Sequence, residues 1–321
     1  MSKTIQRILL SGNRSKQIEN LRQASQYDGC FFIGESPFSE IRETRKKVLK
    51  QLDQFYKKDL KEKQQLGNER QRGYFKIGDE SGNIDLLEKK ECFTFGYDNS
   101  KIPQEFQQIS TLVSQNRFPE EFDFQGFQEL LVKMNETSQQ LVDLCSEAFE
   151  FDFNSTIDET SMYQSFMKSF RYYGRTKNDT VATTGNSLHS DWNLLTLVWA
   201  DTEGLEVLRD DGKFDKVHPQ NQDDLICNFG DFMASLTNGK IRSPWHRVVQ
   251  PPPGKERNSL ILFYYPKYDY PVQKNVIQHQ GRPLGLFVDQ SKSDGTLWDI
   301  DPSIENMGQM YAGKWKQVSR Y

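Results

Sequence analysis

Residues 189–200 read HSDWNLLTLVWA, a polar triplet followed by an apolar run, and this stretch decides the fold class that the sequence predicts. The apolar part, 194–200, has the composition and length of a buried strand. Similar runs recur around it, separated by turn dipeptides such as Asp211-Gly212 and Asn238-Gly239. The predicted strands are residues 170–173, 194–200, 205–209, 225–229, 232–236, 245–249 and 260–265. This spacing predicts a mainly β protein with a sandwich or jelly-roll core.

Residues 1–150 show helical periodicity instead. Ser15 is a candidate N-cap, and an apolar stripe from Ile41 to Leu60 predicts one long amphipathic helix. Another helix is predicted to begin near residue 119. We therefore expect flanking helices and three regions. These are 1–150, helical with a few strands packed on the core; 151–270, the β core; and 271–321, a C-terminal extension expected to cover the mouth of the β core.

Composition narrows the classes of partner. Among 321 residues there is no apolar stretch near the roughly 20 residues of a membrane helix, so we expect no membrane partner. Lys and Arg total 41 against 45 Asp and Glu, and the net charge of −4 provides no basic surface for nucleic acid. The cysteines, Cys30, Cys92, Cys145 and Cys227, form no C-x-x-C pair, which indicates reduced thiols and a cytoplasmic protein. A small-molecule partner is expected, and the oligomeric state stays open.

The polar triplet suggests a metal site. His189 and Asp191 are two residues apart, so on an extended backbone both side chains leave the same face and can reach one ion. This pair alone is a weak signal, because His-x-Asp arises by chance in many proteins. His246 lies far downstream and could complete a set of two imidazoles and one carboxylate, the facial triad that suits non-haem Fe(II). Zinc would accept the same ligands.

A carboxylate-binding pair follows His246 in the chain. Arg257 and Ser259 again stand two residues apart, with the guanidinium and the hydroxyl on a common side. A planar guanidinium offers parallel charge-assisted hydrogen bonds to a carboxylate, and the hydroxyl can donate a further one. The metal pattern and this pair together predict that a dicarboxylic acid binds. The remaining histidines, His218 and His279, are expected to be structural.

Taken together, these residues resemble the iron- and 2-oxoglutarate-dependent dioxygenases of the isopenicillin N synthase-like family. The shared pattern is His-x-Asp, a distal His and then Arg-x-Ser, and His189, Asp191, His246, Arg257 and Ser259 meet it. The resemblance implies a double-stranded β-helix, Fe(II) held by His189, Asp191 and His246 as the catalytic centre, and 2-oxoglutarate bound by Arg257 and Ser259. O2 and a small organic molecule would be the other reactants, with succinate and CO2 released.

The resemblance also implies roles for two residues of the segment Arg171-Tyr172-Tyr173. Tyr173 is expected to contact the distal carboxylate of 2-oxoglutarate, and Arg171 to meet the other carboxylate or the substrate. Both would share one face of a strand, with Tyr172 turned away.

The reaction class remains open between hydroxylation, desaturation and cyclisation. Two other functions also fit the residues: an oxidase of the same fold that does not use 2-oxoglutarate, and a non-catalytic jelly-roll protein in which the triad holds a structural ion such as zinc.

Overall fold

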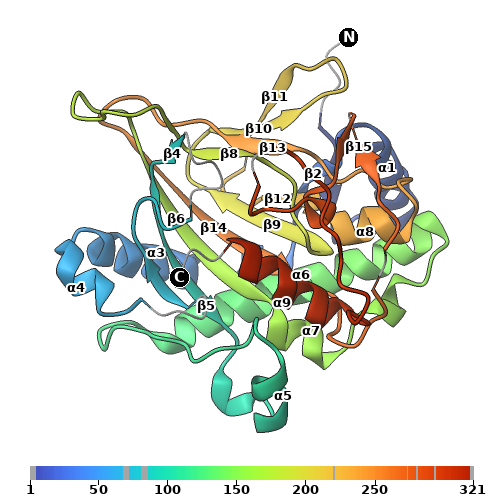
Figure 1. Ribbon diagram of the computed structural model, residues 1–321, viewed down its shortest axis with the longest axis horizontal. Coiled ribbons are helices and arrows are strands. Elements are labelled where there is room, and N and C mark those ends of the chain that lie inside the picture. Colours follow the sequence, from blue (N-terminus) through green and yellow to red (C-terminus); the bar gives the residue numbers. More distant parts are fainter. Residues whose placement is uncertain are drawn as a thin grey trace.

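Two facing β-sheets form the centre of the computed structural model (Figure 1). It describes residues 5–67, 72–80, 86–219, 221–272, 274–279, 281–292 and 294–318. The larger sheet has the order β1 (Arg7–Leu9), β2 (Cys30–Gly34), β12 (Leu225–Phe229), β9 (Leu195–Ala200), β14 (Glu256–Tyr264), β6 (Phe166–Tyr173), β5 (Lys90–Gly96), β3 (Gly73–Phe75). The smaller one has the order β11 (Phe214–Val217), β10 (Leu205–Leu208), β13 (His246–Val248), β8 (Asn186–His189). The predicted jelly-roll core with flanking helices is confirmed.

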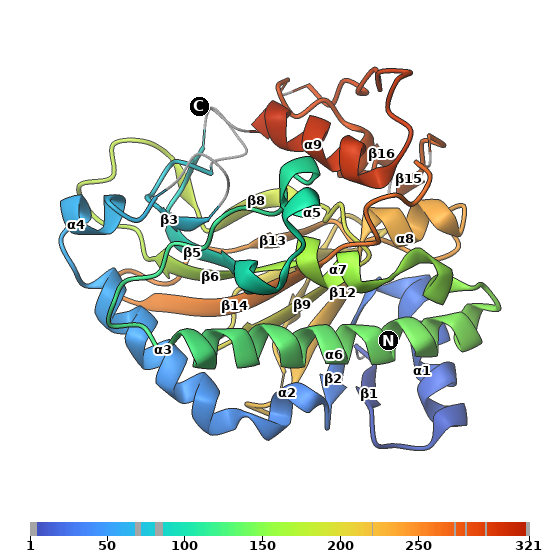
Figure 2. The same cartoon turned by 90° about the horizontal axis from the view of Figure 1, so that it is seen from below.

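Helices cover the larger sheet on its outer face. The longest, α6 (Phe124–Phe149), runs along this sheet, while α9 (Met307–Val318) lies on the opposite side of the same sheet (Figure 2), where its Trp315 packs against Phe166 of β6. The other helices are α1 (Arg14–Tyr27), α2 (Pro37–Glu40), α3 (Arg42–Tyr56), α4 (Leu60–Gln64), α5 (Gln104–Ile109), α7 (Glu159–Gln164) and α8 (Asp231–Leu236). Short pairs, β4 (Leu87–Glu88) with β7 (Thr183–Thr184) and β15 (Gln278–His279) with β16 (Arg282–Pro283), complete the described strands.

Helix α6 forms because its apolar residues recur at helical spacing. Phe127, Leu130, Leu131 and Met134 are fully buried against the sheet. Phe127 stacks on Phe122 with ring centroids 4.9 Å apart, and this pair belongs to an aromatic cluster between the helix and the sheet. Burying such side chains contributes about 1.5–3 kcal/mol each, so the helix is held mainly by its packed face.

Three predicted elements differ from the observed ones. Residues 232–236 lie in helix α8 rather than a strand, because a short run that is buried on all sides carries no period that separates the two. The long stripe after residue 37 is divided among α2, α3 and α4. Helix α1 is capped by Asn13, whose side chain accepts a hydrogen bond from the backbone N–H of Lys16, and not by Ser15.

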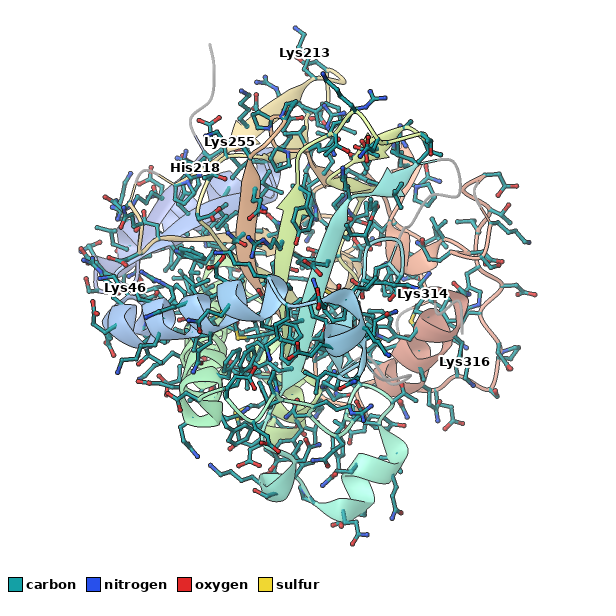
Figure 3. The ribbon with its side chains drawn as sticks, turned by 90° about the vertical axis from the view of Figure 1, so that its left-hand side faces the viewer. Lys46, Lys213, His218, Lys255, Lys314 and Lys316 are labelled. Carbon is teal, nitrogen blue, oxygen red and sulfur yellow. The ribbon has the colours of Figure 1, made fainter. Side chains whose placement is uncertain are left out.

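The outside of the molecule is polar. Lys46 on α3 and Lys213 in the turn between β10 and β11 extend outward (Figure 3), and their side chains are 61% and 81% exposed. The predicted Asp211-Gly212 turn is confirmed, since β10 pairs antiparallel with β11 and Gly212 has a φ of 79°. Within the described part of the chain, no helix has the length and apolar character needed to span a membrane.

Candidate active site

His189, Asp191 and His246 come together between the two sheets. His189 ends β8 and His246 begins β13, and the two face each other directly in this antiparallel pair, with ring centroids 4.3 Å apart. Asp191 lies just beyond β8. One potential ligand atom from each residue lies within 4.8 Å of the other two. Segments that are far apart in the sequence thus place two nitrogens and one oxygen around a common point.

Backbone hydrogen bonds fix which nitrogen of each imidazole can bind a metal, and the candidate nitrogen of His189, Nε2, also lies 3.5 Å from Nδ2 of Asn186. Nδ1 of His189 lies 2.8 Å from the carbonyl oxygen of Ser187, and Nδ1 of His246 lies 3.0 Å from that of Pro244. A carbonyl can only accept, so each Nδ1 carries the proton and each Nε2 presents a lone pair. Both Nε2 atoms lie 3.6 Å from a carboxylate oxygen of Asp191.

Asp191 provides the test of whether a cation fits this site. Its side chain is 6% exposed, and Oδ2 has no hydrogen-bond partner among the described residues. A buried, unpartnered carboxylate oxygen beside two lone pairs is unfavourable unless a cation lies between them. The donors therefore fit a divalent metal, and two nitrogens with one oxygen on one side match the ligand set of non-haem Fe(II).

A cavity extends from these ligands toward Arg257. Its empty volume is about 450 Å³, the open mouth included. Besides the three ligands and Arg257, its lining residues are Phe170, Tyr172, Asn186, Thr196, Val198, Leu205, Asn228, Val248, Ile261 and Phe263. The wall is largely apolar, so a ligand inside would be shielded from water and its few polar contacts would be strengthened.

Arg257 and Ser259 are both buried on the inner face of β14. Arg257 is 2% exposed, and its Nη1 has no hydrogen-bond partner among the described residues; neither has the hydroxyl of Ser259. The guanidinium is 5.2 Å from the ring centroid of Tyr172, and its Nε donates to the carbonyl of Thr202. Burial lowers the pKa of Arg257. A buried cation with a free N–H group is suited to bind an anion.

The structure corrects the predicted orientation of Arg171 and Tyr173. In the antiparallel pair of β14 with β6, Arg257 lies opposite Tyr172, and residues paired in this way point to the same face. Arg171 and Tyr173 therefore point to the other face. There Arg171 forms ion pairs with Asp53 and Glu256.

On that outer face the Tyr173 hydroxyl contacts Glu91. The sequence-based choice of face was wrong because the segment alternates with period two and carries aromatic residues on both faces. Tyr172 and Phe170 line the cavity instead.

Comparisons with known proteins agree with this geometry. The profile described as "2OG-Fe(II) oxygenase superfamily" matches residues 165–266, and the profile "non-haem dioxygenase in morphine synthesis N-terminal" matches residues 4–121. The chain belongs to the 2OG-Fe(II) oxygenase superfamily. It is a 2-oxoglutarate-dependent dioxygenase of the isopenicillin N synthase-like type, with Fe(II) as cofactor and 2-oxoglutarate as cosubstrate, so these predictions are confirmed.

Similar proteins cover most of this oxygenase. A "Probable iron/ascorbate oxidoreductase" of Dictyostelium discoideum is 27% identical over 317 residues, covering 89% of this chain and 82% of the relative. A full-length Neurospora crassa protein, solved in complex with alpha-KG, superposes with a TM-score of 0.72 at 18% identity, over 97% of this chain and 96% of the other. A 2OG-Fe(II) oxygenase family protein from Caulobacter crescentus has a TM-score of 0.74 at 20% identity, over 99% and 100%. The structural matches show the shared fold.

Asp231 connects the metal ligands of this oxygenase to its C-terminal segment. It is fully buried, and its carboxylate accepts hydrogen bonds from the hydroxyls of Ser190 and Ser243 at 3.0 and 2.6 Å and from the backbone N–H of Leu286 at 2.9 Å. Its own N–H donates to the carbonyl of Asp191 at 2.7 Å. Burial raises the pKa of Asp231 to about 7, although these hydrogen bonds oppose the shift.

We expect the Asp231→Ala variant to lose about 2–5 kcal/mol of unfolding free energy, because two hydroxyls and an N–H group lose their buried acceptor. Iron affinity should fall about 10- to 100-fold, as is usual when a group that orients a ligand is removed. Urea unfolding and anaerobic Fe(II) titration measure the two effects. Asp231→Asn keeps one acceptor oxygen and should have intermediate values. Parental stability and affinity in both variants would contradict this role.

The metal-free oxygenase should lose stability as the pH falls from about 6.5 to about 4. Burial and the neighbouring imidazole of His246 lower the pKa of His189 from 6.5 to about 4. In this window the unfolded chain binds a proton that the folded chain does not, so acid favours unfolding. Urea unfolding of apo protein at several pH values measures the slope. His189→Gln removes the titrating group and should flatten the slope relative to the parent; an unchanged slope would contradict the assignment.

Proposed function

We propose that this dioxygenase oxidises a small organic molecule bound next to the metal, by hydroxylation, desaturation or cyclisation, in a reaction that converts 2-oxoglutarate and O2 to succinate and CO2. In the hydroxylation case one oxygen atom enters the substrate and the other enters succinate. The observation that carries the proposal is one cavity that joins three metal donors to a buried guanidinium with a free N–H group.

The proposed roles follow from position. His189, Asp191 and His246 would hold Fe(II), which supplies the activation of O2 when bound. Arg257 and Ser259 would bind the distal carboxylate of 2-oxoglutarate, with the ring of Tyr172 beside the guanidinium. Because Arg257 is already desolvated, the contact forms without a further cost of removing it from water.

The apolar walls of the cavity would keep bulk water away from the reacting atoms. Phe170, Val198, Ile261 and Phe263 are apolar members of the cavity lining. They offer no hydrogen bonds, so the oriented polar groups decide how the cosubstrate lies. The C-terminal extension, 271–321, is proposed to contribute to the cover of the substrate side, supported by the hydrogen bond from Gly285 N–H to Ser190, which lies between two metal ligands.

The test is spectroscopic and then chemical. Under anaerobic conditions, protein loaded with Fe(II) should develop a weak visible absorption band when 2-oxoglutarate is added, because the cosubstrate chelates the metal. With O2 and a pool of metabolites, compounds that raise succinate formation identify the substrate. No band in protein that holds iron would contradict the proposal. O2 uptake that depends on substrate but forms no succinate would indicate the oxidase; tight zinc without O2 uptake would indicate the binding protein.

We also propose a reducing compartment, the cytoplasm, as the location. All four cysteines, Cys30, Cys92, Cys145 and Cys227, are buried free thiols. Burial raises the pKa of the Cys30 and Cys145 thiols, so they stay protonated and unreactive. Imaging of a tagged chain with fractionation would test this location.

A further inference from the structure

One buried side chain of the cavity has no role in the binding scheme above. Asn228 lies on β12, between β2 and β9, and is 1% exposed. Its side chain lines the cavity, yet neither Nδ2 nor Oδ1 has a hydrogen-bond partner among the described residues. Asparagine is disfavoured in strands, and an unsatisfied buried amide is unfavourable. An unpaired amide in a ligand cavity indicates that a bound ligand forms its hydrogen bonds.

The surroundings of Asn228 do not satisfy its amide. Its partner on β9 is Thr196, whose hydroxyl is already hydrogen-bonded to the side chain of Asn193 at 3.0 and 3.2 Å. Phe263 is the next residue across, paired with Thr196 on the other side of β9, and it is apolar. A ligand in the cavity is therefore the partner that the geometry allows.

The position of Asn228 decides which end of the cosubstrate it can reach. Along β9, Thr196 pairs with Asn228 and Ala200 pairs with Ser259. These two β9 residues are four positions apart, which is about 13 Å along a strand. Asn228 is therefore at the far end of the cavity from the Arg257 and Ser259 pair.

The same end of the cavity holds the metal ligands. Three residues after Asn228, the N–H of Asp231 donates to the carbonyl of Asp191. The chain segment that carries Asn228 is thus tied to the segment that carries a metal ligand. An amide here would meet the part of a ligand that lies at the metal.

We infer that Asn228 donates its amide N–H to the carboxylate at the keto-acid end of 2-oxoglutarate, and so acts as a third anchor of the cosubstrate. The inference rests on the proposed function. When a 2-oxo acid chelates a metal, one oxygen of the adjacent carboxylate binds the ion and the other keeps unshared lone pairs. Among the described residues that line the cavity, Arg257 is the only Lys or Arg, and it lies at the other end. The neutral amide of Asn228 is therefore the N–H donor that fits this carboxylate oxygen.

Two variants of similar size separate this role from packing. Asn228→Leu keeps the branching and the number of heavy atoms and removes the donor, and Asn228→Asp keeps the shape and replaces the donor with a negative charge. In each we expect 2-oxoglutarate to bind about 10- to 100-fold more weakly, as for loss of a hydrogen bond to a charged group. Fe(II) affinity without 2-oxoglutarate should stay within about twofold in the Leu variant. Anaerobic calorimetry of the Fe(II)-loaded full chain measures both constants.

Oxalate separates the two ends of the cavity, because it can chelate the metal but has no distal carboxylate. Asn228→Leu should weaken oxalate and 2-oxoglutarate alike. Arg257→Ala should weaken 2-oxoglutarate and leave oxalate within about twofold. The matched control is Asn258→Leu, since this asparagine of β14 is bonded to Asp201 outside the cavity; it should change neither ligand.

Three results would overturn the inference. One is a Leu variant that binds both ligands as the parent does. The second is a Leu variant that binds Fe(II) more weakly but keeps the parental affinity for 2-oxoglutarate at saturating metal. Asn228 would then position Asp191 and would not contact the cosubstrate. The third is weakened 2-oxoglutarate with unchanged oxalate. Failure of the proposed function looks different, because then the parent itself would not bind 2-oxoglutarate.

Discussion

The Asp191→Ala variant is expected to lose iron at concentrations that saturate the parent, with an affinity at least about 100-fold lower. Removing a group that merely orients a ligand costs about 10- to 100-fold, and Asp191 would be a ligand itself and the only anionic one in the set. Two neutral imidazoles remain, and they cannot compensate the charge of the ion. Metal analysis after anaerobic reconstitution, with circular dichroism to verify folding, measures the effect.

The same variant should keep or exceed the stability of the metal-free parent. Oδ2 of Asp191 is buried without a hydrogen-bond partner in the described part of the chain, so its removal relieves an unfavourable group instead of breaking a contact. The matched control is Asp201→Ala, which removes a carboxylate that lies just beyond β9 and bonds Asn258, and it should leave iron binding unchanged. Iron retained by Asp191→Ala at the parental level would refute the metal site.

The Arg257→Ala variant is expected to bind 2-oxoglutarate about 10-fold to more than 100-fold more weakly, with Fe(II) retained. Each charge-assisted hydrogen bond contributes about 1.5–3 kcal/mol, and the guanidinium can form two in parallel. Arg257→Lys keeps the charge but not the fork, and should recover only part of the affinity. Titration of the visible band of the Fe(II) protein with 2-oxoglutarate measures both variants.

Arg171→Ala is the control that tests on which face of β6 the Arg171 side chain lies. It removes a buried guanidinium from the neighbouring strand, on the outer face, where Arg171 pairs with Asp53 and Glu256. We expect this variant to lose some stability and to keep the parental affinity for 2-oxoglutarate. If instead Arg171→Ala weakened the cosubstrate and Arg257→Ala did not, the carboxylate site would lie on the other face of the sheet.

Much of the local structure could be predicted from residue patterns. Helix α6 and strands β9, β12 and β14 have long or strongly apolar signals, and they occur near the expected positions. The strand predicted at residues 232–236 was wrong because a buried strand and a buried helical turn have the same composition. The backbone is still extended at Gly230 and becomes helical only from Asp231. The Asp231 contacts could not be foreseen either, because their partners come from three separate segments of the chain.

By itself the sequence determined the chemistry that this protein can offer: two imidazoles and a carboxylate for a metal, and an arginine with a hydroxyl for an anion. His189 with Asp191, and Arg257 with Ser259, are each two residues apart, so the members of each pair are expected to share a face. Only the tertiary structure decided which face that is. Side chains alternate along a strand, so Tyr172 enters the cavity and Tyr173 does not solely because β6 pairs with β14 in this register. A different pairing of distant strands, β13 with β8, sets His246 against His189, and the side chain of Asn228 on β12 has no hydrogen-bond partner among the described residues.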